Sequence, residues 1–392
     1  MHLHAVRAAD LSPRRAPLRH GSGRFAVLRC AGAPWARSAD RAAGAVSVDH
    51  RHTAQGLSAG PAIHHGETLF TFRPQARALK QEAGKGAGGP MCGIVGLFLK
   101  DESLHPQLGA LMAPMLAEMT DRGPDSAGFA IYRSGPAQPT LSCLGTAQTD
   151  WDAVAAELAA ALDGPVAVDR VADHGLLRVL GDLRAARQHL IETAPEITVL
   201  AAGDAIELFK GIGDPMAVAH RFGLERRAGT HGLAHTRMAT ESAVTTSGSH
   251  PFSTGADTCL VHNGSLSNHH LLRQMLEAQG ERLLTENDSE VAAAFLAWRL
   301  RSGDTLRQAL EAALTRLDGF YTLTIGTRDG FAVLRDPIAC KPAVLAETDR
   351  WVAMASEFRA IAPLPGVETA RIWEPEPGVV YTWGRGGMAV AA

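Results

Sequence analysis

Residues 91–98 read MCGIVGLF, and this stretch decides how the rest of the chain is interpreted. Apolar and β-branched residues follow Cys92 directly, which is typical of a short buried strand. The run is too short to span a membrane, and the chain holds no run of eighteen apolar residues elsewhere. We therefore expect a strand that begins at a cysteine and enters the core of a domain.

The residues before this stretch differ in composition from those after it. Residues 1–90 carry 13 Lys and Arg against 5 Asp and Glu, and they hold 7 of the 17 His. Their apolar residues follow no helical or alternating pattern, so they bury too little apolar surface to offset the entropy of ordering. We expect a disordered leader, which is either upstream sequence read from a start set before Met91 or a removable pro-segment. A nucleic-acid-binding tail and a secretory signal fit less well, because clustered Lys and Arg with aromatics and an apolar signal core are both lacking.

The overall composition describes a globular protein. The 392 residues are 46% hydrophobic and 20% charged, which allows one or two domains, and the net charge of −3 argues against nucleic acid as the main partner. Five cysteines are too few for a disulfide framework and form no close-spaced metal or iron–sulfur motif: Cys30, Cys92, Cys143, Cys259 and Cys340. We expect a cytoplasmic protein with no membrane span that binds no metal or redox cofactor itself.

From residue 91 onward, predicted strands outnumber predicted helices. The patterning predicts helices over 106–120, 151–162, 268–279, 289–301 and 304–317. It predicts strands over 92–98, 128–132, 196–201, 206–209, 230–236, 258–262, 320–326, 331–335, 350–355 and 378–383. Asn268 is a plausible N-cap, and Asp304 the start of the last helix. Because the strands occur in groups with helices between them, layered sheets covered by helices are expected.

Cys92 can carry nucleophilic chemistry if the residues before it are removed. A terminal cysteine has a thiol and an α-amine on one residue, and an α-amine has a pKa of about 7.7–8. That amine can take the thiol proton near neutral pH and so activate its own nucleophile. The alternative is a buried core cysteine at the end of a strand.

Two polar motifs end predicted strands. HTRMAT begins at His235, and its Arg237 offers a planar fork for a carboxylate. VHNG ends at Gly264, whose backbone N–H together with the Asn263 amide gives the two donors that an oxyanion hole needs. Asn-Gly is also a common hairpin turn, and this alternative stays open.

Two more motifs flank helices. DRGPDSAG begins at Asp121, and its Arg122 on a Gly-Pro turn can fix the backbone beside a nucleophile, although alone the segment is simply a turn. NDSE precedes a helix, so Asp288 or Ser289 is either a helix cap or, for Asp288, a ligand of a substrate ammonium. A nucleophile, a base, two oxyanion donors and clamps for a carboxylate and an ammonium are what hydrolysis of an amino-acid side-chain amide requires.

In this order along the chain, the motifs resemble those of the class II glutamine amidotransferases. The resemblance spans nearly all of residues 91–385. It implies the N-terminal-nucleophile hydrolase fold, an α+β four-layer αββα sandwich. It also implies that residues 91–392 form one glutamine amidotransferase domain, in which 133–195 is an insertion relative to shorter members.

The resemblance implies catalytic roles for three residues. Cys92 corresponds to the nucleophile, with its freed α-amine as the base, and Asn263 and Gly264 correspond to the oxyanion hole. Since Cys92 is peptide-bonded in the sequence as given, the full-length form is expected to be inactive.

The resemblance also implies binding roles. Arg237 would hold the glutamine α-carboxylate and Asp288 the α-ammonium. Thr240 would line the pocket, and Arg122 would support the nucleophile loop.

A glutaminase that releases ammonia through a Cys92 thioester is therefore expected, with glutamine as its substrate. Because this domain uses nearly everything after residue 91, the acceptor is expected on partner subunits. Stand-alone glutaminase chains resemble the small subunit of N-methylglutamate synthase, whose glutamate-synthase-like partner chains carry flavin and iron–sulfur centres. The alternatives are an N-terminal-nucleophile amidase with another substrate and a non-catalytic structural or regulatory subunit.

Overall fold

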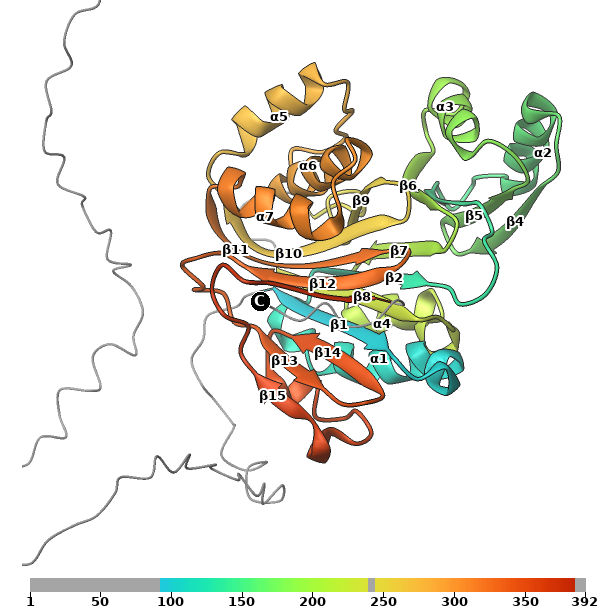
Figure 1. Ribbon diagram of the computed structural model, residues 1–392. Coiled ribbons are helices and arrows are strands. Elements are labelled where there is room, and N and C mark those ends of the chain that lie inside the picture. The colour runs from blue at the N-terminus through green and yellow to red at the C-terminus, as the bar shows by residue number, and fades with distance from the viewer. Residues whose placement is uncertain (1–91, 239–243, 385–392) are drawn as a thin grey trace, which may run out of the picture. The chain divides into compact units, whose positions relative to one another are not determined.

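A computed structural model of the chain describes residues 92–238 and 244–384. The predicted leader over 1–90 and the predicted pocket residue Thr240 lie outside these ranges. Across the two ranges, no helix combines the length and the apolar character needed to cross a membrane. Figure 1 shows two sheets lying face to face with helices on their outer sides, and a third sheet beside them.

The first sheet has seven strands in the order β15-β13-β14-β1-β8-β2-β7, and all neighbours are antiparallel. β1 (Gly93–Leu99) lies at its centre, and all of its residues are buried, which explains the unbroken apolar run after Cys92. The other strands are β2 (Ser126–Tyr132), β7 (Ile206–Ile212), β8 (His231–Arg237), β13 (Val344–Glu347), β14 (Trp351–Ala355) and β15 (Arg371–Trp373).

The second sheet has five antiparallel strands in the order β16-β12-β11-β10-β9. They are β9 (Phe252–Gly255), β10 (Thr258–Leu266), β11 (Gly319–Thr327), β12 (Gly330–Arg335) and β16 (Val380–Gly384). Three helices cover its outer face, α5 (His269–Ala278), α6 (Asp288–Arg301) and α7 (Leu306–Arg316). α6 is buried on most sides because it lies between the sheet and the other two helices.

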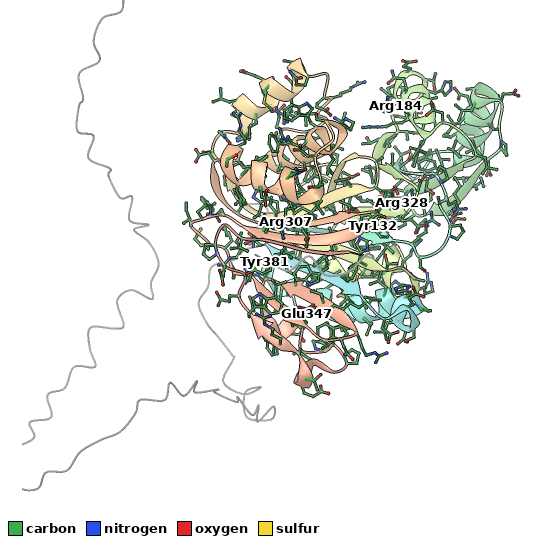
Figure 2. All side chains as sticks on the ribbon, viewed as in Figure 1. Tyr132, Arg184, Arg307, Arg328, Glu347 and Tyr381 are labelled. Atoms are coloured by element: carbon green, nitrogen blue, oxygen red, sulfur yellow. The ribbon has the colours of Figure 1, made fainter. Side chains whose placement is uncertain are left out.

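The two faces of β1 serve two different cores. Ile94 points between the sheets and packs with Val261 of β10 and Val333 of β12. Val95 points the other way, toward α1 (Leu108–Ala117) and α4 (Pro215–Arg221). The side chains in Figure 2 fill the space between the layers. The fold is thus the predicted α+β sandwich of four layers, αββα.

A third, four-stranded sheet forms a subdomain over residues 140–203. Its elements are β3 (Thr140–Leu144), α2 (Trp151–Leu162), β4 (Val166–Val171), β5 (His174–Val179), α3 (Leu183–Thr193) and β6 (Thr198–Gly203). The β-α-β-β-α-β succession with the antiparallel order β4-β5-β3-β6 is a ferredoxin-like arrangement. The subdomain contains most of the stretch 133–195, whose status as an insertion stays a prediction.

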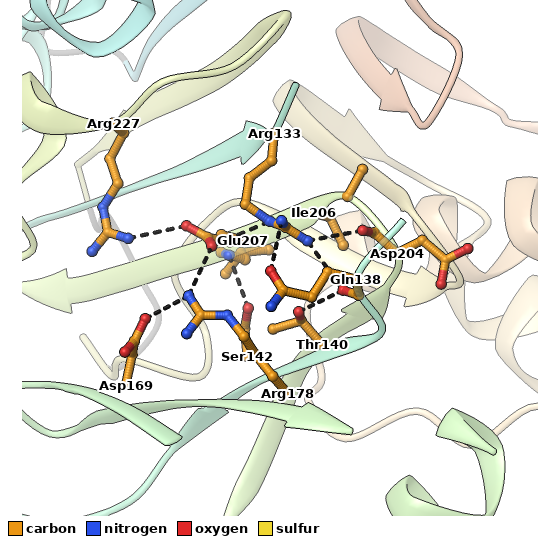
Figure 3. Close-up of polar contacts among 12 residues, drawn as sticks. Arg133, Gln138, Thr140, Ser142, Asp169, Arg178, Asp204, Ile206, Glu207 and Arg227 are labelled. Carbon is orange, nitrogen blue, oxygen red and sulfur yellow. Dashed lines mark hydrogen bonds and ion pairs between the residues drawn. The ribbon is translucent and has the colours of Figure 1, made fainter. Parts of the chain in front are cut away.

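A buried carboxylate joins this subdomain to the first sheet (Figure 3). Glu207 of β7 is 3% exposed, and Arg227 Nη1 lies 3.0 Å and Arg133 Nε 3.3 Å from its oxygens. Arg178 of β5 reaches the same carboxylate at 3.9 Å. In addition, Ser142 Oγ of β3 accepts a main-chain hydrogen bond from β7 at 3.0 Å. Polar contacts from two of its strands therefore fix the subdomain against β7.

Asn268 occupies the N-cap position of α5 as predicted, but without a capping hydrogen bond, and the predicted helix start at Asp304 is wrong. The Asn268 side chain does not cap α5; it donates to the Arg316 carbonyl at 2.8 Å and accepts from the Asp318 N–H at 3.1 Å. α7 is capped by Thr305 rather than started by Asp304. At α7, the neighbouring Thr305 Oγ1 accepts from the Gln308 N–H at 3.2 Å and so takes the capping role.

Candidate active site

Three of the predicted site residues meet where β1 begins. The main-chain carbonyl of Cys92 accepts a hydrogen bond from Asn263 Nδ2 at 3.0 Å and a second from Arg122 Nε at 3.2 Å. The half-buried Cys92 thiol lies 3.9 Å from the carbonyl oxygen of Met238. The backbone that carries the thiol is therefore held from two sides.

Arg122 ends a short 3-10 helix, Thr120–Arg122. Its guanidinium also forms an ion pair with Glu357, which directly follows the strand β14 and Ser356. Arg122 thus connects Cys92, the residue before β1, with Glu357, which follows β14, a strand paired with β1. The role of Arg122 as a support of the nucleophile loop stays a prediction.

Hydroxyl groups fix the first residues of β1. The Gly93 N–H donates to Thr236 Oγ1 at 3.2 Å, and that hydroxyl donates to the Met119 carbonyl at 3.0 Å. The Ile94 N–H donates to Ser356 Oγ at 2.9 Å. The two residues that follow Cys92 are therefore anchored to neighbouring segments of the first sheet, and this anchoring fixes where Cys92 lies.

Asn263 and Gly264 lie within β10, so the alternative of a hairpin turn is wrong. Gly264 pairs with Tyr321 of β11, and the strand continues beyond it. Its φ of 153° lies in the region that only glycine adopts readily, and a Cβ there would collide with the main-chain oxygen of Phe320. Glycine is needed at position 264 because the backbones of two strands approach closely there.

Arg237 is the last residue of β8, the strand that pairs with β1 through Gly93 and Thr236. It is 8% exposed and lies one residue beyond that pair, at the end of the sheet where Cys92 lies. Its positive charge contributes, after burial, to the lowered pKa of His235 and of His250.

Asp288 is the first residue of α6, but it does not cap the helix. Asn287 is the cap, because its side chain accepts from the Ser289 N–H at 2.9 Å. Asp288 instead accepts from the main-chain N–H of Leu266 at 2.9 Å and so connects α6 to β10, the strand that carries Asn263. The capping interpretation of Asp288 and Ser289 is therefore wrong.

A buried polar cluster that the sequence analysis missed lies behind these residues. Ser289 Oγ lies 2.9 Å from His250 Nε2 and 2.8 Å from His262 Nδ1. His235 Nε2 donates to the His262 carbonyl at 3.1 Å and its ring stacks on that of His250. Burial lowers the pKa of all three histidines, to about 3 for His235. Two of the histidines, His235 and His262, belong to the motifs HTRMAT and VHNG, and this is the sequence signal that could have pointed to the cluster.

The cysteines of the described ranges differ in exposure. Burial raises the pKa of Cys143 and of Cys259 to about 12, so both are unreactive core residues. Tyr132, labelled in Figure 2, donates to Cys259 Sγ at 3.4 Å across the two sheets. Cys340 is exposed and Cys92 half-buried. Among residues 92–238 and 244–384, no group of His, Cys, Asp or Glu is arranged to hold a metal ion.

Comparisons with known proteins identify the family of the chain. Residues 235–363 match the family model of a glutamine amidotransferase domain. The chain is 52% identical over 298 residues to the glutamine amidotransferase-like protein GlxB of Rhizobium meliloti (strain 1021), an alignment that covers 75% of this chain and 98% of the relative. It is 38% identical over 103 residues to glutamine–fructose-6-phosphate aminotransferase of Shewanella oneidensis, covering 26% of this chain and 17% of that protein.

The fold also has a counterpart among solved structures. Glutamine phosphoribosylpyrophosphate amidotransferase from B. subtilis superposes with a TM-score of 0.50 at 21% sequence identity. The superposition covers 77% of this chain and 49% of that one, so this chain spans about half the length of that structure. At this level of identity, the likeness concerns the fold alone.

Proposed function

This chain belongs to the class II glutamine amidotransferases, and on that premise we propose that it hydrolyses the side-chain amide of glutamine at Cys92. The observation that carries the proposal is the double hydrogen bond to the Cys92 carbonyl from Asn263 and Arg122. It supports the proposal because it holds the backbone of Cys92 against the side-chain amide of Asn263, the proposed oxyanion donor.

The base in this proposal is the α-amine of Cys92, so residues 1–91 have to be removed. The amine, with an ordinary pKa of about 7.7–8, takes the thiol proton directly or through one water. The thiolate attacks the carboxamide carbon, the C–N bond breaks, and the proton leaves with ammonia. Water then attacks the γ-glutamyl thioester, releases glutamate and restores the thiol.

Asn263 and Gly264 are the proposed oxyanion donors. The Asn263 amide has two N–H groups, so it can donate one to the Cys92 carbonyl and the other to the oxyanion. The Gly264 N–H is the second donor. One such donor in a preorganised site is worth about 3–4 kcal/mol of barrier.

Arg237 and Asp288 are the proposed clamps for the substrate's α-carboxylate and α-ammonium. Together they favour a free α-amino acid over an amide inside a peptide. We also propose that Thr240, which lies outside the described residues, lines the same pocket.

We further propose that the ammonia passes to an acceptor on partner subunits. Glutamine amidotransferase domains use glutamine and pass ammonia to acceptor domains. The alignment with the Shewanella aminotransferase covers 17% of that protein and leaves the rest of its length unmatched. An N-methylglutamate synthase-like complex, with flavin and iron–sulfur centres on glutamate-synthase-like chains, fits this division. Because a catalytic thiol has to stay reduced, we place the complex in the cytoplasm.

An intact mass of the protein from its host, with and without a glutamine-mimicking diazoketone, tests the glutaminase. We expect a chain that begins at Cys92 and takes one adduct, which peptide mapping assigns to this residue. Cys92→Ala should take none, whereas the exposed-thiol control Cys340→Ser should be labelled like the wild type. An unreactive chain beginning at Cys92, or an adduct on Cys340 alone, would refute the proposal.

The partner proposal has its own test in the reconstituted complex. Cys92→Ala should abolish product formation from glutamine but leave product formation from free ammonia. Full activity of this variant with glutamine would mean that the chain is a structural or regulatory subunit.

A further inference from the structure

The hydroxyl of Ser289 contacts three polar groups behind the proposed site. Its Oγ lies 2.9 Å from His250 Nε2, 2.8 Å from His262 Nδ1 and 3.3 Å from Asp288 Oδ1. Ser289 itself is 1% exposed. Since a hydroxyl has one hydrogen and two lone pairs, these contacts use its whole capacity.

The contact with Asp288 decides which group donates to which. A carboxylate only accepts, so the Ser289 hydrogen has to point at Asp288. The two lone pairs of Ser289 then face the histidine pair, which we define as His250 and His262, and both rings have to donate. This hydrogen-bond network assigns the proton of His250 to Nε2 and that of His262 to Nδ1.

The other nitrogens of the histidine pair support this assignment. Among residues 92–238 and 244–384, neither His250 Nδ1 nor His262 Nε2, both of which are buried, meets a hydrogen-bond partner. A proton on either would add an unpaired buried donor, which is costly. Burial also lowers the pKa of both rings, and for His262 it outweighs the opposing effect of Asp288. Both rings are therefore neutral, with one fixed tautomer each.

The position of His250 is fixed through its own backbone. Lys210 of β7 is fully buried, and its Nζ donates to the carbonyls of Ser247 and Ser249 at 2.9 Å and of Pro251 at 3.4 Å. These three carbonyls flank His250 on both sides. The backbone that carries His250 is therefore held in place, so its Nε2 hydrogen already points at Ser289.

Asp288 receives a donor on each oxygen, Oδ1 from Ser289 and Oδ2 from the Leu266 N–H at 2.9 Å. Two donors on different oxygens fix the plane of a carboxylate, and the side chain keeps 22% of its surface open. We propose that the histidine pair directs the Ser289 hydrogen to Asp288 and thereby holds the carboxylate in the orientation that selects substrates with an α-ammonium. Ser289 and the histidine pair are thus positioning residues. The inference rests on the proposed role of Asp288.

The test compares glutamine with glutaramate, which is glutamine without its α-amino group. Ser289→Ala should lower kcat/KM for glutamine about ten- to a hundred-fold, mainly through KM, because a hydrogen bond to a charged group is lost. The kcat/KM for glutaramate should stay within about two-fold, because this substrate has no ammonium to align. The selectivity ratio between the two substrates should therefore fall.

Two substitutions of His250 provide a matched pair. His250→Gln keeps an N–H donor at about the reach of Nε2 and should retain most of the selectivity ratio. His250→Leu has no donor and should lower the ratio as Ser289→Ala does. Equal losses for the two substrates in Ser289→Ala would mean a structural role only and would overturn the inference.

Asp288→Asn separates this inference from the proposed function. If Asp288→Asn leaves the ratio unchanged, or if the wild type hydrolyses neither compound, the proposed function falls and the inference falls with it. If Asp288→Asn lowers the ratio but Ser289→Ala does not, the inference alone is wrong. Two-bond nitrogen–proton couplings of 15N-histidine-labelled protein give an independent answer. The opposite tautomer in either ring of the histidine pair would also overturn it.

Discussion

The side-chain amide of Asn263 donates to the main-chain carbonyl of Cys92 at 3.0 Å, although 171 positions separate the two residues. Asn263 lies in the second sheet, and Cys92 precedes the central strand of the first. The contact between the two inner layers therefore brings the proposed nucleophile to the proposed oxyanion donor, and no loop is needed to do so. Strand positions hold such a geometry more rigidly than loops do, which suits a preorganised site.

Replacing Asn263 with Ala should lower kcat for glutamine hydrolysis about 10²- to 10³-fold and leave KM nearly unchanged, because an oxyanion donor acts in the transition state. Steady-state ammonia release measures both constants. Asn268→Ala is the matched control, since that amide only connects α5 to the segment before β11. An Asn263→Ala enzyme with the wild-type kcat would exclude Asn263 from the oxyanion hole.

Gly264→Ala should destabilise the fold more than Gly280→Ala does. Both glycines have positive φ, but a Cβ at Gly264 meets the Phe320 oxygen, whereas nothing lies within 4 Å at Gly280. We expect a loss of about 1–2 kcal/mol in the free energy of unfolding for Gly280→Ala, and about 2–3 kcal/mol more for Gly264→Ala. Urea unfolding measures the difference. Equal losses would show that the two strands separate easily at this point.

Lys210 should make stability depend on pH. Burial lowers its pKa to about 7, whereas the unfolded chain keeps the ordinary value of 10.5. Between these values the unfolded state binds more protons, so the free energy of unfolding rises with pH. Relative to Lys210→Met, the wild type should gain about 1.5 kcal/mol between pH 7.0 and 8.5. Urea unfolding at both pH values provides the comparison, and parallel pH profiles would contradict the lowered pKa.

Glu207→Gln should cost about 3 kcal/mol in the free energy of unfolding, because it leaves the guanidinium groups of Arg133 and Arg227 without their buried carboxylate. The control is Glu157→Gln, whose exposed carboxylate has only His189 as its ion-pair partner and should change stability by less than about 0.5 kcal/mol. Thermal unfolding of both variants tests this. A Glu207→Gln protein as stable as the control would mean that the subdomain is held by apolar contacts alone.

The sequence patterns predicted the central layers well and the subdomain poorly. The strand after Cys92 is buried on both faces, so its apolar run is unbroken and easily recognised. β4 has no fully buried residue, and α3 buries only Ala186 and Leu190. Short elements that cover one face of a small sheet carry too few apolar residues to form a clear period, and both were missed.

For the site, the sequence proposed residues of which the fold brings Cys92, Arg122 and Asn263 together, but it did not predict how they are held. The motifs suggested that Arg122 and Asn263 lie near Cys92, but they did not predict that both donate to its main-chain carbonyl. The arrangement around Ser289 was not, because a serine next to an aspartate at a helix start has a sufficient explanation as a cap. Only the folded chain makes Asn287 the cap and leaves the Ser289 hydroxyl for two histidines.

Thr140 and Gly203, the first and last residues of the subdomain, are direct partners in its sheet. Just outside them, the Gln138 N–H donates to the Asp204 carbonyl at 2.9 Å. The chain thus leaves the sandwich and returns to it at one point, so the two ends of the subdomain lie side by side. A subdomain whose two ends are adjacent can be exchanged as a unit, either by recombination in evolution or by a designer who inserts a sensor domain between the same two chain ends.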